Sequence, residues 1–353
     1  MTPSPYRPGC ALQPHILRRS DRHLPFSLPD TATAVIQNVL GTTMSPVREV
    51  IVRTQSGSEL RAVLKIYDRR FGLDLRQIKR HPDPHRAVHE DAFRSFVERG
   101  KMTGFLREHE RKTREQGTPV RASTYLDEPQ DGRARYEAAL WQECAEHFEC
   151  ETEAYSQLSD LQGSLIPHMY AHVRITGAYE TQPPSPSTAR YFEIRGVLLQ
   201  AIGGYKLWDI ATAPEAPANP GAWQAIIQSA SNAAYEINRR GVVMEDCAPR
   251  NVVVDARTQR PFIVDLAECE FRDRLAEVWR AMDDNDEDWD PDIEYWQLMR
   301  QSNNPGKIGA PMVRQLQLQR GMKLQGITYP DYDGIIRDLG RKKGLKGESP
   351  VVE

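Results

Sequence analysis

The stretch from Gly241 to Glu268, GVVMEDCAPRNVVVDARTQRPFIVDLAE, constrains the fold of this chain more than any other part. Before it, apolar residues recur at spacings of three and four between Trp223 and Ile237, which predicts an amphipathic helix. Within it, the runs 252–254 and 262–264 are rich in β-branched and aromatic residues, and a tight turn separates them. A helix, a polar loop and a β-hairpin in succession predict a mixed α+β domain.

Three polar residues stand at the ends of these predicted elements. Asp246 and Asn251 lie in the loop that leaves the helix, and Asp265 follows the second strand directly. Phosphoryl transfer uses such a set, because one Asp accepts the proton of the attacking hydroxyl while an Asn and a second Asp hold Mg²⁺ on the phosphates. We therefore expect Asp246 to be a catalytic base and Asn251 and Asp265 to be metal ligands. The alternative is that Asp246 and Asn251 are ordinary turn residues.

The window resembles the catalytic segment of the protein-kinase-like fold. Asp246 to Asn251 matches the second half of the catalytic loop H-R-D-x-x-x-x-N, and Val264 to Ala267 stands in the place of the metal-binding D-F-G. Upstream, Ala62 to Lys65 matches the third-strand motif V-A-I-K, whose lysine contacts the nucleotide phosphates.

More narrowly, the chain is similar to the kinase-like proteins that are abundant in fungal genomes. It shares with them V-L-K-x-Y-D-x-R-F at Val63 to Phe71, E-x-x-x-Y-x-x-L-x-x-L-Q-G-x-x-I-P at Glu151 to Pro167, and D-x-A-P-R-N at Asp246 to Asn251. The order and spacing of the three phrases are more specific than any one of them. The resemblance covers roughly residues 32–280.

This resemblance implies a two-lobed α+β fold with ATP and Mg²⁺ in the cleft. A β-rich N-lobe is expected at residues 31–203, a short helical C-lobe at 204–345 and a tail at 346–353. The proline-rich residues 1–30 read as an extended or disordered lead-in. Residues 69–140 are crowded with charged side chains and poor in aliphatic ones, so we expect a charged, partly helical insertion without a core of its own.

The resemblance also assigns the nucleotide-binding residues. Lys65 would contact the phosphates and pair with a Glu of a helix predicted at 141–161; Glu151 is preferred and Glu153 is the alternative. Lys65 could instead be an outward-facing strand residue, and Glu151 a plain surface residue. The adenine would bind backbone groups of a hinge that contains Gln200, Ala201 and Ile202.

Several departures from the kinase pattern leave the function open. Met244 and Glu245 replace the His-Arg pair, Leu266 and Ala267 replace Phe-Gly, and the phosphate-covering loop offers only Gly41. The retained Lys, Glu, Asp, Asn and Asp favour an ATP-dependent phosphotransferase that acts on a hydroxyl of a protein or small molecule. The departures favour a pseudokinase that binds nucleotide or a partner without turnover. A scaffold whose insertion binds partners is a third possibility.

The composition of the chain limits which classes of binding partner and which cellular compartment we expect. The chain has 46 Lys and Arg against 49 Asp and Glu, a net charge of −3, which gives no reason to expect nucleic acid or an anionic membrane. No stretch approaches the roughly 20 apolar residues of a membrane span, and the N-terminus lacks the apolar core of a signal peptide. The five cysteines form no C-x-x-C pair. We expect a cytoplasmic or nuclear protein.

Overall fold

The computed structural model describes residues 4–20, 24, 28–54, 57–176, 185–282, 289–322, 324 and 326–343. The chain divides into unit 1, residues 1–152 with 168–201, and unit 2, residues 153–167 with 202–353. Each unit contains helices and strands, so the predicted α+β class is confirmed. In the described residues, no helix combines the length and the apolar character that crossing a membrane requires.

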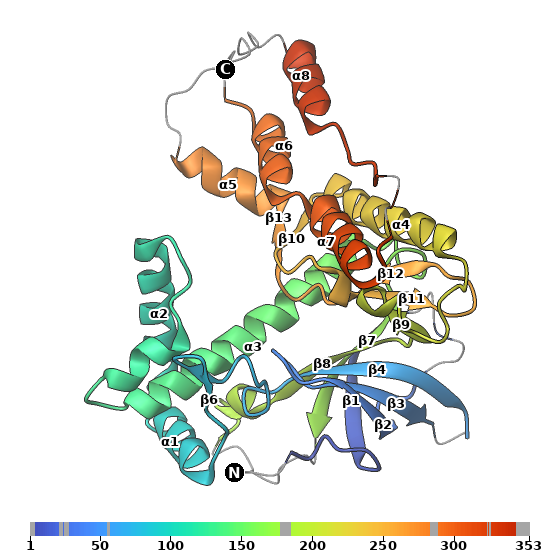
Figure 1. Cartoon of the computed structure of the whole chain (residues 1–353). Helices are drawn as coiled ribbons and strands as arrows, with labels where there is room; N and C mark the ends of the chain where they lie inside the picture. Colours follow the sequence, from blue (N-terminus) through green and yellow to red (C-terminus); the bar gives the residue numbers. More distant parts are fainter. Residues whose placement is uncertain are drawn as a thin grey trace. The chain divides into compact units, whose positions relative to one another are not determined.

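Unit 1 is built on a closed antiparallel barrel (Figure 1). Alternate side chains of each strand enter the barrel, as period-two geometry requires, so Ala62, Leu64 and Ile66 are completely buried in its core. Lys65 and Tyr67 therefore lie on the opposite face of their strand. The barrel strands, in spatial order, are β1 (Ala11–Arg19), β2 (Thr33–Gly41), β3 (Val47–Arg53), β4 (Glu59–Tyr67), β8 (Ile194–Gln200) and β7 (Met169–Thr176).

Strand β1 lies in the segment predicted to be an extended or disordered lead-in, and for Ala11–Arg19 the disordered alternative is wrong because the chain forms an extended strand. β1 pairs with β7 from Gln13 to Arg19 and with β2 at Ala11 and Leu12, which closes the barrel. Leu12 and Pro14 are buried, whereas Ala11 and Gln13 are exposed. This is the alternation of a half-buried strand, which the proline content obscured.

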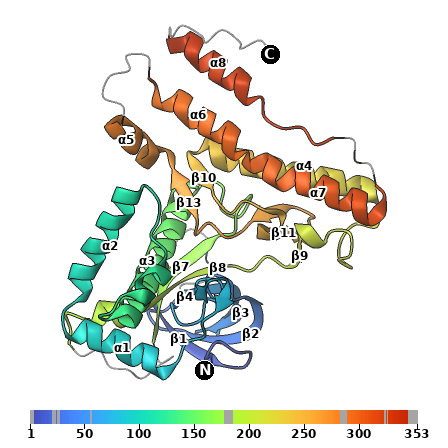
Figure 2. The same cartoon turned by 60° about the vertical axis from the view of Figure 1, so that its left-hand side comes forward.

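The insertion contains α1 (Ala87–Glu98), α2 (Met102–Gln116), the 3₁₀ turn η1 (Ala122–Asp127) and the start of α3 (Gly132–Gln157), after a small hairpin of β5 (Gln77–Ile78) and β6 (His81–Pro82). Its partly helical character is confirmed. Helix α3 begins and ends earlier than the predicted range of 141–161. In Figure 2, α1, α2 and α3 lie close together at one side of unit 1.

The insertion does form a core, contrary to the prediction. Aromatic rings replace the missing aliphatic side chains: the Phe105 ring centroid lies 5.0 Å from that of Tyr125 and 6.0 Å from that of Phe96. The guanidinium of Arg69 lies 3.9 Å from the Phe93 centroid, so arginine also packs on aromatic faces here. In α1, α2 and η1, six apolar side chains are at most 3% exposed: Phe93, Phe96, Val97, Met102, Phe105 and Tyr125.

A buried carboxylate connects this core to the barrel. Glu137 of α3 is completely buried and accepts hydrogen bonds from Arg69 at 2.8 Å and from Arg76 at 2.6 Å. Both arginines precede the helices and follow β4. The charged composition therefore reflects internal ion pairs as well as a solvated surface.

Unit 2 is centred on α4 (Pro220–Arg239), whose start follows from its sequence. The Asn219 side chain accepts a hydrogen bond from Gly221 N–H, and Pro220 occupies the first turn. The apolar stripe of α4 packs against α7 and against β10 and β12; Figures 1 and 2 both show α4 and α7 side by side. The remaining elements of unit 2 are β9 (Gly204–Lys206), η3 (Leu207–Asp209), β10 (Val242–Met244), η4 (Pro249–Asn251), β11 (Val252–Asp255), β12 (Pro261–Ile263), β13 (Cys269–Phe271), α5 (Arg272–Met282), α6 (Pro291–Ser302), α7 (Asn304–Arg320) and α8 (Tyr332–Lys343), while η2 (Ala189–Phe192) belongs to unit 1.

The segment 153–167 belongs to unit 2, whereas the sequence-based division placed it in the N-lobe. Backbone pairing explains the difference, because Ile263 N–H donates to Leu165 O at 2.8 Å. Arg240 also forms an ion pair with Asp160 at 2.7 Å. The predicted tail at 346–353 lies outside the described residues.

Candidate functional site

In unit 1, Lys65 and Glu151 form a buried ion pair. Lys65 sits in β4 opposite Val47 of β3 and Val197 of β8, on the face turned away from the barrel core. Its Nζ lies 3.1 Å from Glu151 Oε2, and the two side chains are 6% and 0% exposed. Glu153, the alternative partner in the sequence analysis, instead pairs with Arg274.

Tyr67 completes this cluster. Its hydroxyl donates a hydrogen bond to the same carboxylate oxygen of Glu151, and Lys65 Nζ lies 5.6 Å from the centre of its ring. Lys65 and Tyr67 share one face of β4 because they are two residues apart. The Lys65 ammonium and the Tyr67 hydroxyl thus both interact with the buried Glu151 carboxylate. These interactions compensate the free-energy cost of removing the carboxylate from water.

In unit 2, the hairpin β11–β12 brings Asn251 and Asp265 to the same end. Val252 pairs with Ile263, and Val264 N–H donates to Asn251 O at 2.8 Å, so Asp265 directly follows the residue opposite Asn251. Asn251 Nδ2 donates to both the backbone O and the Oδ2 of Asp246, each at 2.9 Å. These bonds occupy the amide nitrogen and leave Oδ1 of Asn251 as the atom suited to a metal ion.

Asp265 has an uncommon backbone conformation. Its φ is +69°, in the left-handed region that few residues other than glycine adopt, although Asp is among the more tolerant. The next side chain, Leu266, is completely buried and Ala267 is 6% exposed. Ala267 does not have positive φ, so this loop does not require the glycine of D-F-G at that position. Strain of this kind often accompanies functional sites.

The loop that carries Asp246 is braced by Asn304, a residue that the sequence analysis missed. Asn304 is completely buried; its Oδ1 accepts from Met244 N–H at 3.1 Å and its Nδ2 donates to Met244 O at 2.8 Å. Asn238, also completely buried, donates to the same Oδ1 at 2.8 Å. The Asn-Asn-Pro pattern at 303–305 indicates a helix start, but no local pattern reveals a contact 60 residues away.

Cys247, which follows Asp246, is a structural residue here. Its thiol donates to Asn304 O at 3.4 Å, and burial raises its pKa to about 12. A thiol with such a high pKa is protonated at neutral pH and is a poor nucleophile.

The predicted hinge residues lie at the passage from unit 1 to unit 2. Gln200 ends β8; its N–H donates to His168 O at 2.8 Å, and its Oε1 accepts from His168 N–H at 3.1 Å. Ala201 and Ile202 follow without regular secondary structure, and the boundary falls between them. Gly204 then allows close pairing with β11, since a Cβ there would lie 1.8 Å from Val254 O.

The predicted site residues therefore fall into two groups, each well defined within its own unit. Lys65 and Glu151 belong to unit 1, whereas Asp246, Asn251 and Asp265 belong to unit 2. Among the described residues, His, Cys, Asp and Glu side chains form no group of three or more that could hold a metal ion. The expected magnesium site would not form such a group, because it has only two protein ligands, and one of them, Asn251, is an amide.

No family model matches the chain, and no curated protein matches its sequence. Two solved structures of the Mycobacterium tuberculosis PknI kinase domain, a double mutant and a single mutant, are 14% and 13% identical to it, with TM-scores of 0.32 and 0.31. In both cases 88% of this chain and 84% of the kinase-domain chain are covered. An identity and a TM-score this low support no conclusion by themselves.

Proposed function

We propose that the protein is an ATP- and Mg²⁺-dependent phosphotransferase of the protein-kinase-like class, which transfers a phosphoryl group to a hydroxyl of a protein or a small molecule. The observation that carries this proposal is the arrangement of Asp246, Asn251 and Asp265 in unit 2. The Asn251 amide donates a hydrogen bond to the Asp246 carboxylate, and the backbone pairing of the hairpin puts Asp265 at the same end as Asn251. This is the donor set that phosphoryl transfer requires.

Each residue has a distinct role in this proposal. Asp246 accepts the proton of the acceptor hydroxyl. Asn251 Oδ1 and Asp265 hold Mg²⁺, which neutralises charge on the phosphates when bound. Lys65, oriented by Glu151, contacts the phosphates. The adenine binds backbone groups of the hinge at Gln200, Ala201 and Ile202.

One observation favours a pseudokinase as the second candidate. Both oxygens of the Asp246 carboxylate already accept hydrogen bonds, Oδ1 from Arg250 and Oδ2 from Asn251. An acceptor hydroxyl must share one of these oxygens with Arg250 or Asn251, or displace Arg250 from Oδ1. Arg250 is 60% exposed, so a substrate can move it at small cost. In a pseudokinase the Arg250 contact would be permanent.

Isothermal titration calorimetry with Mg²⁺-ATP tests the nucleotide site. Asp265→Asn should weaken binding about tenfold or more, because a metal ligand loses its charge. The matched control is Asp255→Asn at the other end of the same hairpin, where the carboxylate accepts hydrogen bonds from the Thr258 N–H and hydroxyl and has no role in the proposed metal site. Equal affinities of wild type, Asp265→Asn and Asp255→Asn would refute the metal assignment.

Transfer of labelled γ-phosphate separates the two candidate functions. Asp246→Asn should keep Mg²⁺-ATP binding and lower the transfer rate by about 10²–10⁴-fold, the usual contribution of a general base. Intact protein and a cell lysate serve as acceptors. If wild type and Asp246→Asn both bind ATP but transfer phosphate only at the background rate, the protein is a pseudokinase.

A further inference from the structure

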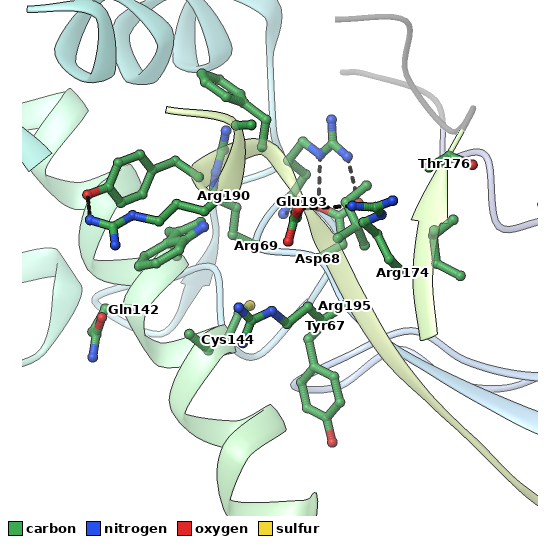
Figure 3. A pocket seen from close by; sticks show the side chains of 18 of the residues that line it. Tyr67, Asp68, Arg69, Gln142, Cys144, Arg174, Thr176, Arg190, Glu193 and Arg195 are labelled. Carbon is green, nitrogen blue, oxygen red and sulfur yellow. Dashed lines mark hydrogen bonds and ion pairs between the residues drawn. The ribbon is translucent and has the colours of Figure 1, made fainter. Parts of the chain in front are cut away.

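Unit 1 contains a pocket of about 400 Å³ that includes none of the proposed nucleotide or metal residues. Its walls come from the end of β4, from α3 around residues 141–149, from β7 and β8, and from the segment 189–193 (Figure 3). The volume lies in the range of small-molecule sites. Tyr67 borders the pocket, and in Figure 3 its ring extends away from the arginines.

Two of the arginines in the walls are already neutralised. Arg69 pairs with Glu90 at 2.6 Å and with Glu137 at 2.8 Å. Arg70 pairs with Asp68 at 2.8 Å. All of these side chains are largely buried, so they form a rigid wall and offer little charge to a ligand.

Three further arginines carry the charge of the pocket: Arg174, Arg190 and Arg195, all labelled in Figure 3. Arg174 pairs through Nη1 with Glu193 at 3.2 Å, while its Nε is buried and has no hydrogen-bond acceptor in the described part of the chain. A buried donor without an acceptor is costly, and an anionic ligand would satisfy it.

The other two arginines are weakly compensated. Arg195 lies 3.7 Å from Glu149, which is 67% exposed. Arg190 donates to the Tyr191 hydroxyl at 2.6 Å and has no ion pair with a carboxylate among the described residues. Three cations therefore face two partly exposed carboxylates, Glu149 and Glu193, which leaves an excess of positive charge.

Aromatic rings form the remaining wall. The ring centroids of Trp141 and Tyr191 lie 5.1 Å apart in an edge-to-face arrangement, and Phe192 adjoins them. Trp141 and Tyr191 are held by different elements, α3 and η2. Such a wall favours a flat ring, which can stack on or meet the edges of these side chains.

We propose that this pocket binds a small aromatic anion. Its ring would pack against Trp141 and Tyr191, and its carboxylate, phosphate or sulfonate would bind the guanidinium groups of Arg174 and Arg195. Arginine suits this role because its planar fork donates two parallel hydrogen bonds to such groups. The assignment does not depend on the proposed phosphotransferase activity, because none of the residues assigned to ATP, Mg²⁺ or the acceptor hydroxyl lines this pocket.

Fluorescent dyes test the proposal without nucleotide. Anilinonaphthalene sulfonate carries an aromatic system and one anionic group, and phenylnaphthylamine is the same dye without the sulfonate. The wild-type protein should bind the sulfonate at one saturable site and bind the neutral dye at least tenfold more weakly. Equal affinities for the two dyes would refute the role of the arginines.

Variants locate the binding site. Arg174→Gln combined with Arg195→Gln should weaken sulfonate binding at least tenfold, and Ala145→Phe should block the pocket sterically. Ala145 lines the pocket and is only partly buried, so the larger ring can be accommodated in the fold. The control is Arg53→Gln, which removes a solvent-exposed arginine of unit 1 outside the pocket. Thermal melts confirm that each variant is folded.

Competition completes the test. Phenyl phosphate should displace the bound dye at concentrations where inorganic phosphate does not, because only the former offers a ring. Displacement by both at the same concentration would reduce the site to a nonspecific anion site and overturn the proposal. Dye binding that is unchanged in both the double variant and Ala145→Phe would place the dye elsewhere, which also overturns it.

Discussion

Replacing Lys65 by Met should destabilise the protein far more than the loss of an ordinary surface charge. The Lys65 and Glu151 side chains are 6% and 0% exposed, and their charged atoms lie 3.1 Å apart. At the effective dielectric constant of about 20 that describes such sites, the attraction is about 5 kcal/mol. Removal of Lys65 takes the positive charge away from the buried Glu151 carboxylate, to which the Tyr67 hydroxyl still donates, and we expect a loss of about 3–5 kcal/mol.

The double variant Lys65→Met with Glu151→Leu separates the ion pair from packing. With both charges removed, no uncompensated buried charge remains, so the double variant should be more stable than Lys65→Met alone. The control cycle uses Arg53 and Glu59, a pair at 2.8 Å whose side chains are 57% and 55% exposed. Removing either member should cost less than about 1 kcal/mol.

Urea unfolding followed by circular dichroism measures these free energies. A Lys65→Met cost as small as that of Arg53→Met would refute the reasoning, because it would mean that water reaches the Glu151 carboxylate. The folded double variant also isolates the proposed nucleotide role, since its affinity for Mg²⁺-ATP can be measured without a loss of structure. It should bind Mg²⁺-ATP more weakly than wild type.

Three further predictions follow from buried polar groups. Asn304→Ala should lower stability by about 2–4 kcal/mol, because it leaves both backbone groups of Met244 without partners; a thermal melt measures this. Glu137→Gln should cost about 3–5 kcal/mol in urea unfolding, since it removes the negative charge that compensates Arg76. Burial lowers the pKa of His89 to about 4, below the value of about 6.5 in the unfolded chain, so the unfolded state binds more protons between these values. Stability should therefore fall as the pH drops from 6.5 toward 4, with a slope approaching about one proton, and His89→Gln should flatten this part of the profile.

Short-range patterns predicted the hairpin and its polar residues because the determinants are local. Short runs rich in β-branched and aromatic residues mark β11 and β12, and the tight turn between them pairs the two strands, so Asn251 and Asp265 lie at the same end of the hairpin. The spacing of Glu151 from the apolar residues of its helix likewise predicted the face that meets Lys65. In each case the interacting elements are recognisable on their own.

Contacts between distant segments were not predictable in this way. The insertion was predicted to lack a core of its own because it is rich in charged residues, whereas in the structure the buried Glu137 neutralises arginines more than 60 residues upstream. Aromatic rings such as Phe105 and Tyr125 supply a core that a count of aliphatic residues misses. Strand β1 was overlooked because prolines obscured its alternation, and only its pairing with β7 reveals its role.

The hydrogen bonds that Asn304 makes to Met244 bear on one departure from the kinase pattern, the missing histidine at position 244. Met244 stands where kinases have a histidine whose side chain supports the catalytic loop, and its loss favoured a pseudokinase on sequence grounds. In this chain the support acts on the backbone of Met244, through one donor and one acceptor of a completely buried amide. The side chain at 244 is then free to be apolar, and it is 3% exposed in the core. The missing histidine therefore weighs little against activity. The choice between a phosphotransferase and a pseudokinase depends on the contact between Arg250 and Asp246, so Arg250→Gln is the decisive variant. If Arg250 only competes with the acceptor hydroxyl for Asp246, Arg250→Gln should raise the rate of phosphotransfer and leave the affinity for Mg²⁺-ATP unchanged. If this variant binds ATP but transfers phosphate only at the background rate, the protein is a pseudokinase.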